Sequence, residues 1–248
     1  MSDRLIVSLD LGDLDIIKSL VEQLKGMVNF YKIGSIPFTY FGPSIVKFLK
    51  NKGYKVMLDL KYHDIPNTVA CACESASEMD VDFITLHTSG GFSMLEAAVK
   101  ATLLAAHDKN IERAKLLGIT VLTSLDEAYF KDLFGEIKRT IEEQVIFLAQ
   151  LARSAGLDGV IASPKETSMI RRECGKDFLI VTPGIRSATL EKEIIIGDDQ
   201  ARTMTPKEAI KAGANYIVVG RPIVKALNPK EATEKIIREI EDGCREIA

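Results

Sequence analysis

The amino-acid sequence predicts an α/β protein, a single (β/α)8 (TIM) barrel domain spanning residues 1–248. Short apolar runs rich in strand-forming residues alternate with amphipathic helical patterns along the whole chain. Eight such runs are present, which is the strand number of this barrel, and no low-complexity linker interrupts the series. A length of 248 residues is also normal for one barrel domain.

The predicted strands are nearly continuous in apolar residues, as expected of parallel strands covered on both faces. In chain order they are residues 5–10, 30–34, 55–60, 83–87, 116–122, 159–162, 179–182 and 216–219. The segments between them have helical periodicity, with single apolar faces formed by Leu14, Ile17, Val21 and Leu24, by Ile141, Val145, Leu148 and Ala152, and by Ile236 and Ile240 in a closing helix. An open doubly wound sheet would show the same alternation. The absence of G-x-G-x-x-G after the first strand weakens its dinucleotide-binding form.

Composition and charge exclude several classes of partner. The chain is 46% hydrophobic and 27% charged, with a net charge of −3, so its overall charge does not favour nucleic acid or an anionic membrane. The N-terminus lacks the pattern of a secretory signal, and no apolar stretch reaches membrane-spanning length. The four cysteines form no C-x-x-C pair, which indicates reduced thiols and a cytoplasmic protein.

Polar and charged residues collect where the predicted strands end. A barrel carries its active site at that face, so such residues are candidates for function. They are Asp10, Lys32, Asp59, Lys61, His87, Thr123, Ser124, Pro183, Arg186, Gly220 and Arg221. Their recurrence at equivalent positions is difficult to explain as solvated surface charge.

The densest group is Asp59-Leu-Lys61-Tyr-His-Asp64-Ile-Pro66. Side chains alternate along a strand, so Asp59 and Lys61 should point to the same side, and Lys32 can approach from the neighbouring strand. We expect an array of Lys32, Asp59, Lys61 and Asp64. Burying such charges for structure alone costs several kcal/mol per ion, which favours a catalytic role. The flanking carboxylates should keep Lys61 a cation, and therefore an acid rather than a Schiff-base nucleophile.

The last two strands are followed by glycine–arginine segments, residues 183–186 and 219–222. Barrels often bind phosphate at these positions, where glycine permits close approach of backbone amides and arginine provides a bidentate donor. Between them, the polar stretch of residues 187–203 is long for a simple connection, and we expect it to act as a lid.

These motifs resemble those of the orotidine 5′-monophosphate decarboxylase family over nearly the whole chain. The motifs are Leu-Asp10, Tyr-Lys32-Ile-Gly34, Asp59-x-Lys61-x-x-Asp64-Ile-Pro66, Leu122-Thr-Ser124, Pro183-Gly-Ile-Arg186, Asp199-Gln200-Ala-Arg202, Thr205-Pro206 and Gly220-Arg221-Pro-Ile223. The stretch from 187 to 199 is longer and more apolar than the short glycine-rich loop expected at this place in the family. The resemblance implies a decarboxylase that uses neither cofactor nor metal, acts on orotidine 5′-monophosphate in the last step of UMP synthesis, and works as a homodimer.

The resemblance also implies a role for each matching residue. Asp10 and Lys32 would contact the ribose hydroxyls, and Asp59 would sit beside the substrate carboxylate. Lys61 would protonate C6 as carbon dioxide leaves. Thr123 and Ser124 would lie against the pyrimidine, with Ser124 hydrogen-bonding the base, and Pro183 would also bind the substrate. Arg186, Gln200, Gly220 and Arg221 would hold the phosphate. Asp64 and Thr68 would enter the active site of the partner subunit.

Two alternatives remain at this point. The first is a magnesium-dependent enzyme of the same superfamily, a hexulose-6-phosphate synthase or keto-gulonate-phosphate decarboxylase. Lys32 stands where a magnesium site would call for an acidic residue, which argues against this alternative. The second is a non-catalytic nucleotide-binding protein, for which altered residues at Asp59, Lys61 or Asp64 would be expected. All three are intact.

Overall fold

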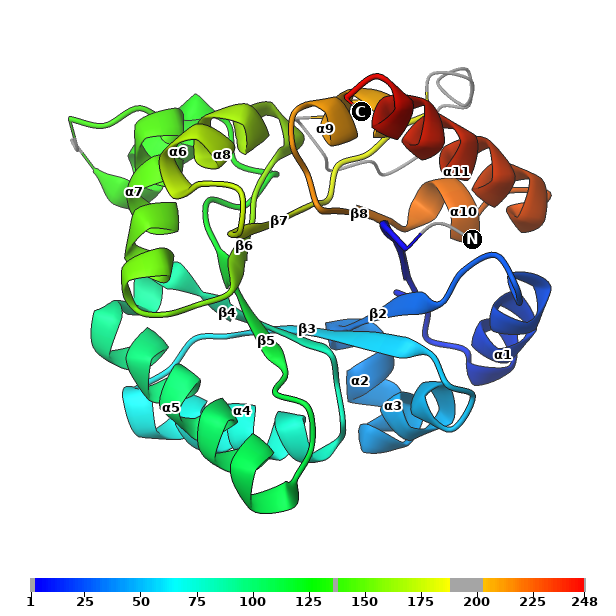
Figure 1. The fold of residues 1–248 in the computed structure, drawn as a ribbon, viewed down its shortest axis with the longest axis horizontal. Coiled ribbons are helices and arrows are strands. Elements are labelled where there is room, and N and C mark those ends of the chain that lie inside the picture. Colours follow the sequence, from blue (N-terminus) through cyan, green and yellow to red (C-terminus); the bar gives the residue numbers. More distant parts are fainter. Residues whose placement is uncertain (1–2, 136–137, 188–202, 248) are drawn as a thin grey trace.

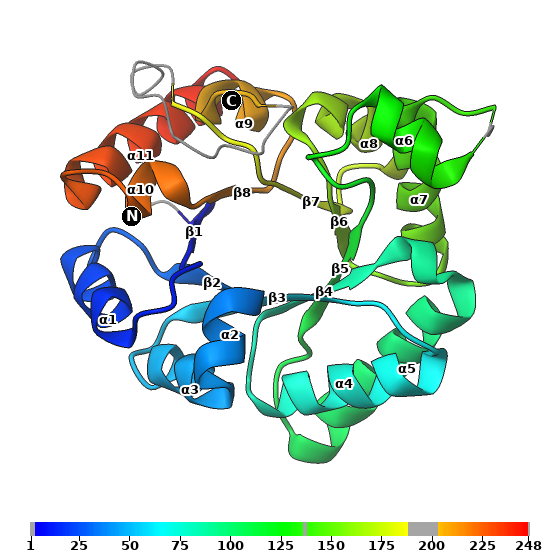
Figure 2. The same ribbon diagram turned by 180° about the vertical axis from the view of Figure 1, so that it is seen from behind.

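The computed structural model describes residues 3–135, 138–187 and 203–247. In these residues eight parallel strands pair in sequence order, and the last pairs with the first to close a barrel. Figure 1 shows the strands as a central ring surrounded by helices, and Figure 2 shows the same ring from behind. The fold is therefore the (β/α)8 barrel predicted from the alternating patterns.

The elements follow one another as strand and helix along the chain. The strands are β1 Leu5–Ser8, β2 Phe30–Gly34, β3 Lys55–Tyr62, β4 Phe83–His87, β5 Lys115–Ile119, β6 Gly159–Ile161, β7 Leu179–Thr182 and β8 Tyr216–Val219. The helices are α1 Leu14–Gln23, α2 Ser35–Phe41, α3 Pro43–Lys50, α4 Pro66–Glu78, α5 Phe92–Lys109, α6 Glu127–Phe134, α7 Ile141–Ser154, α8 Thr167–Cys174, α9 Pro206–Lys211, α10 Arg221–Val224 and α11 Pro229–Arg245. Short 3-10 turns lie at η1 Thr88–Gly90 and η2 Pro164–Glu166.

Every predicted strand is present, and only the ends differ. β1 stops two residues before Asp10, β5 stops before Leu122, and β3 continues to Tyr62. The apolar runs overestimate β1 and β5 because Leu9 and Val121, just beyond the strands, are also buried. Burial, rather than backbone pairing, determines how far an apolar run extends.

Local sequence explains where several helices begin. The Asp13 side chain accepts hydrogen bonds from the N–H groups of Asp15 and Ile16 at the start of α1. Thr140 forms a capping box with Glu143 at α7, and the same arrangement recurs at α9. Such caps satisfy backbone donors that have no partner inside the helix.

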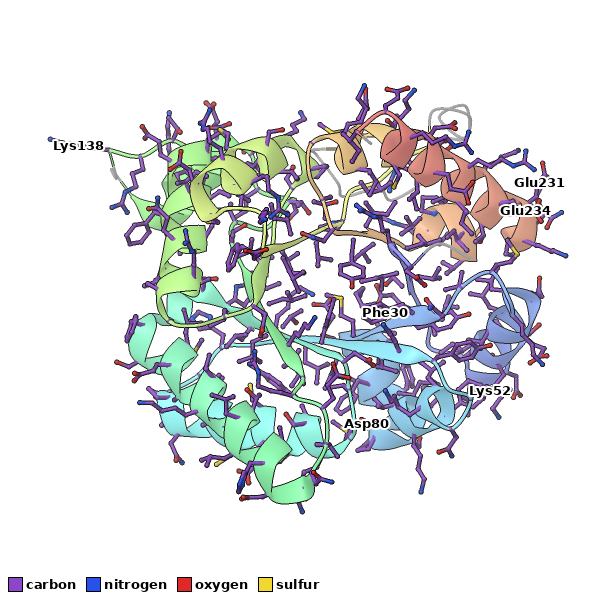
Figure 3. The ribbon with its side chains drawn as sticks, in the orientation of Figure 1. Phe30, Lys52, Asp80, Lys138, Glu231 and Glu234 are labelled. Atoms are coloured by element: carbon purple, nitrogen blue, oxygen red, sulfur yellow. The ribbon has the colours of Figure 1, made fainter. Side chains whose placement is uncertain are left out.

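Alternate residues of the strands fill the barrel interior with an apolar plug. We use this name for Ile6, Phe30, Met57, Phe83, Leu117, Val181 and Val218, which Ile161, Leu179 and Tyr216 adjoin. The rings of Phe30, Phe83 and Tyr216 meet edge to face, with centroids 5.0 to 5.8 Å apart. Figure 3 shows Phe30 at the ring of strands, whereas charged residues such as Lys52 and Glu231 lie at the periphery.

A second apolar layer joins the outer faces of the strands to the helices. It includes Ile17 and Val21 of α1, Val145 and Leu148 of α7, and Ile236 of α11, which the helical periodicity placed on inward faces. The two layers fix the strands from both sides. Among the described residues, no helix is long and apolar enough to cross a membrane.

Candidate active site

A cavity of about 570 Å³ lies at the C-terminal ends of the strands. Its wall has a charged part from β1 to β3, an apolar and hydroxyl part from β5 and β6, and a glycine–arginine part after β7 and β8. The principal residues of these parts are Asp10, Lys32, Asp59 and Lys61; Ile119, Leu122, Thr123, Ser124 and Ile161; and Pro183, Gly184, Arg186, Gly220 and Arg221. The predicted site residues that the structure describes thus meet at one place, with the exception of His87, Asp64 and Thr68.

A polar layer lies directly on the apolar plug. Ser8, Lys32, Asp59 and Thr85 each stand two residues after a plug residue in the same strand. Since side chains alternate along a strand, these four also point inward, one layer nearer the cavity. All four are buried, with Lys32 8% and Asp59 6% exposed. The alternation of side chains along the strands therefore places the charges of Lys32 and Asp59 at the base of the cavity.

Two lysine side chains converge on one carboxylate oxygen, Oδ2 of Asp59. The Nζ atom of Lys32 lies 3.0 Å from Oδ2 of Asp59 and 3.1 Å from both carboxylate oxygens of Asp10. The Nζ atom of Lys61 lies 2.9 Å from the same Oδ2 of Asp59. Lys32, Asp59 and Lys61, which we call the charge array, alternate in sign, so each charge is compensated by a neighbour.

The pKa shifts of Lys32 and Asp59 favour the charged forms of these two residues. Burial alone would raise the pKa of Asp59, but the nearby ammonium groups of Lys32 and Lys61 outweigh it and lower the pKa to about 2. Burial alone would lower the pKa of Lys32, but Asp59 and Asp10 outweigh it and raise that pKa. Buried Lys32 and Asp59 therefore remain charged at neutral pH. The Lys61 side chain is 38% exposed and lines the cavity, so its ammonium group can meet a ligand.

The backbone at Lys61 departs from a regular strand. Its φ angle is +52°, and the register between β3 and β4 shifts between Leu58 and Tyr62. The prediction that Asp59 and Lys61 meet is right, but simple alternation is not the reason. The irregular backbone directs the lysine toward the carboxylate.

Gly34 permits the close approach of Asp10 and Lys32. A Cβ atom at this position would overlap Oδ1 of Asp10 and lie 3.0 Å from Nζ of Lys32. Ser8 donates a hydrogen bond of 2.6 Å to Oδ2 of Asp10 and holds the carboxylate from the other side. The absence of a side chain at position 34 is thus a steric requirement of this part of the site.

The glycine–arginine part of the wall is tied to the segment before α9. The N–H of Arg186 donates to the carbonyl of Met204 at 3.0 Å, and the N–H of Met204 donates to the carbonyl of Gly184 at 3.2 Å. Gly184 has a φ angle of +73°, which glycine adopts readily. Arg186 and Arg221 therefore border the same cavity from two consecutive strand ends.

Three described residues among the predicted ones, His87, Asp64 and Thr68, are not in the cavity wall. Asp64 and Thr68 are exposed, on the loop after β3 and the first turn of α4, and Asp64 accepts a hydrogen bond of 2.6 Å from the N–H of Ile65. Among the described residues, Asp64 forms no ion pair with Lys61 or Lys32, so the expected four-charge array is a three-charge array within one chain. Asp64 lies on the loop beyond the end of β3, outside the cavity wall. Gln200 and residues 188–202 of the predicted lid lie outside the described residues.

Some residues of the site were not anticipated. Ser8 and Thr85 touch the carboxylates of Asp10 and Asp59, and Lys225 lines the cavity one helical turn after Arg221. The two hydroxyl residues precede Asp10 and His87 by two positions, so strand periodicity could have identified them. Lys225 could have been found from its spacing of four residues from Arg221.

No cluster of three or more His, Cys, Asp or Glu side chains that could hold a metal ion occurs in the described ranges. His87, at the end of β4, packs against His63 with ring centroids 5.2 Å apart. Burial, with His63 and Lys61 nearby, lowers the pKa of His87 and favours its neutral form. Neither histidine lines the cavity described above.

Comparison with known proteins places this geometry in context. Residues 3–236 match the family model described as "Orotidine 5'-phosphate decarboxylase / HUMPS family". A protein of Geobacter metallireducens named orotidine 5′-phosphate decarboxylase is 46% identical over 241 residues, covering 97% of each chain. One of the same name from Legionella pneumophila is 44% identical and covers 97% of this chain and 100% of its own.

Solved structures show the same likeness. The crystal structure of orotidine 5′-phosphate decarboxylase from Lactobacillus acidophilus superposes with a TM-score of 0.81 at 37% identity, covering 96% of this chain and 99% of that one. A conserved protein of Geobacillus kaustophilus, described as uncharacterized, superposes with a TM-score of 0.80 at 33% identity. It covers 95% of this chain and 99% of its own.

Proposed function

The chain belongs to the orotidine 5′-phosphate decarboxylase / HUMPS family, and we propose that it converts orotidine 5′-monophosphate to uridine 5′-monophosphate and carbon dioxide. The observation that carries this proposal is the charge array at the base of a cavity whose wall also presents Arg186 and Arg221. Such a cavity suits a ligand with a phosphate at one end and a second anionic group at the other.

The substrate would lie across the three parts of the cavity wall. Its phosphate would contact Arg186, Gly220 and Arg221, with Gln200 as a further contact. Asp10 and Lys32 would bind the ribose hydroxyls, and Pro183, Thr123 and Ser124 would surround the pyrimidine. Phosphate binding far from the reacting carbon can contribute to the transition state when that remote binding energy is used to orient the substrate.

Lys61 would act on the reacting carbon. The bond between C6 and the carboxylate breaks, carbon dioxide leaves, and the electron pair stays on C6, where no adjacent π system delocalises it. The ammonium of Lys61 would stabilise this charge and then give its proton to C6, and the neutral lysine would regain a proton from water. A preorganised cation at the position of developing charge is the largest contribution in many enzymes. The proposed chemistry uses no cofactor or metal.

Asp59 would hold both lysines in place. Its Oδ2 accepts from Lys61 and lies 3.0 Å from Lys32, so the Lys61 ammonium is directed by a carboxylate that is itself buried. Its charge beside the substrate carboxylate would also disfavour the bound ground state. The main role we assign to Asp59 is the orientation of Lys61.

We also propose a homodimer in which Asp64 and Thr68 complete the partner's site. Both residues are exposed, and the neighbouring Ile65 exposes 67% of its surface although it is apolar. Their exposure leaves the side chains of Asp64 and Thr68 available to a partner subunit. The four cysteines are free thiols, which supports a cytoplasmic location.

The direct test of the function measures the loss of orotidine 5′-monophosphate absorbance. The wild-type chain should turn over, and EDTA should leave the rate unchanged. Lys61→Ala should abolish turnover but keep the Kd for UMP within about tenfold, because the ammonium acts mainly in the transition state. Lys100→Ala, at an exposed lysine of α5, is the matched control and should behave as wild type. Activity that depends on added magnesium would instead favour the magnesium-dependent alternative, a hexulose-6-phosphate synthase or keto-gulonate-phosphate decarboxylase.

The dimer is tested by mixing two inactive variants. Lys61→Ala and Asp64→Asn homodimers should each be nearly inactive. After co-refolding in equal amounts, random pairing leaves about a quarter of all sites intact, so activity should rise toward about a quarter of wild type. Mixing without subunit exchange should restore nothing. No recovery after demonstrated exchange would mean that Asp64 serves its own chain.

A further inference from the structure

Thr85 of β4 touches both residues to which the proposed chemistry assigns the central roles. It is fully buried, and its hydroxyl donates a hydrogen bond of 2.9 Å to Oδ1 of Asp59. The hydroxyl oxygen of Thr85, Oγ1, also accepts a hydrogen bond of 3.0 Å from the backbone N–H of Lys61. Thr85 is not part of the cavity wall described above, so it would act through these two neighbours rather than on a ligand.

The hydroxyl replaces a missing backbone partner. Leu58 pairs with Ile84 and Tyr62 pairs with Leu86, so residues 59–61 of β3 lie opposite Thr85 alone. A regular ladder cannot continue across such a bulge, and the extra residues lose their backbone partners. The Thr85 side chain supplies an acceptor for one of them, the N–H of Lys61.

The conformation of Lys61 makes this bond more important. Its φ angle of +52° lies in the left-handed region, which is unfavourable for a residue with a Cβ atom. In the described residues, the other non-glycine positions with positive φ are Asp80 and Asn110, which follow the ends of α4 and α5, where this conformation is common. Lys61 adopts it inside a strand, so a local contact must hold it there.

The second bond of Thr85 orients the carboxylate. Oδ2 of Asp59 faces both lysines, at 3.0 Å from Lys32 and 2.9 Å from Lys61, and Oδ1 is occupied by the Thr85 hydroxyl. Rotation of the carboxyl group would break one set of contacts. A neutral donor at Oδ1 therefore keeps Oδ2 directed toward the ammonium groups.

We propose that Thr85 is a positioning residue that sets the place of the Lys61 ammonium through its bonds to Asp59 and to the Lys61 backbone. This inference rests on the proposed decarboxylation. Substitution should affect the chemical step more than ligand binding, because the phosphate and ribose contacts lie elsewhere in the cavity. Displacement of a reacting group by about 1 Å can lower the rate about a hundredfold.

The test compares Thr85→Val with Thr85→Ser. Valine keeps the shape but removes the hydroxyl, which leaves Oδ1 of Asp59 and the N–H of Lys61 without this partner. Serine keeps the hydroxyl. We expect kcat of Thr85→Val to fall by about ten- to a hundredfold. The Kd for UMP should stay within about threefold, and Thr85→Ser should recover most of kcat, since only the hydroxyl acts on its neighbours.

Thr102→Val provides the matched control for lost stability. Thr102 is also fully buried, and its hydroxyl donates to a helix carbonyl, that of Val99, at 3.0 Å. We expect its kcat to remain near wild type although the protein loses a buried hydrogen bond. If Thr85→Val turns over as wild type, if serine fails as valine does, or if kcat and UMP affinity fall together, the positioning role is wrong.

A crystal structure of Thr85→Val separates this inference from the proposed function. The Asp59 carboxylate should be rotated and the Lys61 backbone changed, whatever substrate the enzyme uses. Unchanged geometry at both residues would overturn the role of Thr85. A wild-type chain that does not decarboxylate orotidine 5′-monophosphate would overturn the proposed function and leave this structural test intact.

Discussion

Asp59→Asn removes the one carboxylate that two lysines share. The amide keeps the size of the side chain but carries no charge, so Lys61 loses its ion pair and Lys32 keeps only Asp10. Because Lys32 is buried, the substitution should lower the free energy of unfolding as well as the activity. The pKa of Asp59 sets the size of this loss of stability.

A pKa lowered from 3.8 to about 2 means that folding favours the charged carboxylate by about 2 kcal/mol at pH 7. A lowered pKa stabilises the fold above the unfolded value, near pH 4, and this contribution disappears as the pH falls through about 2. It should be about half as large at pH 3. This loss of about 2 kcal/mol is smaller than the roughly 3–5 kcal/mol lost when one partner of a fully buried ion pair is removed. The loss is smaller because Lys61 is partly solvated and Lys32 retains its ion pair with Asp10.

Urea unfolding of wild type and Asp59→Asn at pH 7 and pH 3, at one protein concentration, measures this difference. We expect a loss of about 2 kcal/mol at pH 7 and about 1 kcal/mol at pH 3. Asp15→Asn is the matched control, since its side chain is 94% exposed and its pair with Lys18 spans 3.7 Å, and it should change stability little at either pH. A loss of equal size at both pH values would refute the electrostatic explanation.

Three further substitutions test separate parts of the structure. Gly34→Ala fits the backbone, whose φ is −92°, but displaces the Asp10 carboxylate, so calorimetry should show about tenfold weaker UMP binding. Arg171→Ala removes bonds to carbonyls beside β7 and β8 and should lower the free energy of unfolding by about 2–4 kcal/mol, while exposed Arg172→Ala should not. Arg221→Ala should raise KM at least tenfold, because a bidentate contact to the phosphate is lost. An unchanged KM would mean that the phosphate does not bind at Arg221.

The sequence alone was sufficient for the fold and for most of the site. Apolar periodicity is a local property, and eight repeats of it predicted the eight strands that the structure contains. Residues at strand ends meet whenever parallel strands close into a barrel, so Lys32, Asp59 and Arg221 could be assigned to one cavity before their distances were known.

The tertiary structure was required for the contacts that depend on exact strand register. Thr85 reaches Asp59 and Lys61 only because β3 bulges against β4, and no periodicity in the sequence marks that bulge. Gly34 was predictable as the end of a strand, but the overlap that excludes a side chain there involves Asp10, which follows a different strand, β1.

Asp64 illustrates the same limit. Its spacing from Lys61 suggested a place in one array, yet the loop after β3 leaves it exposed and outside the cavity wall. Residue type and spacing determined which charges this protein brings to the mouth of the barrel. Backbone register and side-chain packing between distant strands determined which of those charges meet. Contacts of about 3 Å depend on residues that are close in space but far apart in the chain.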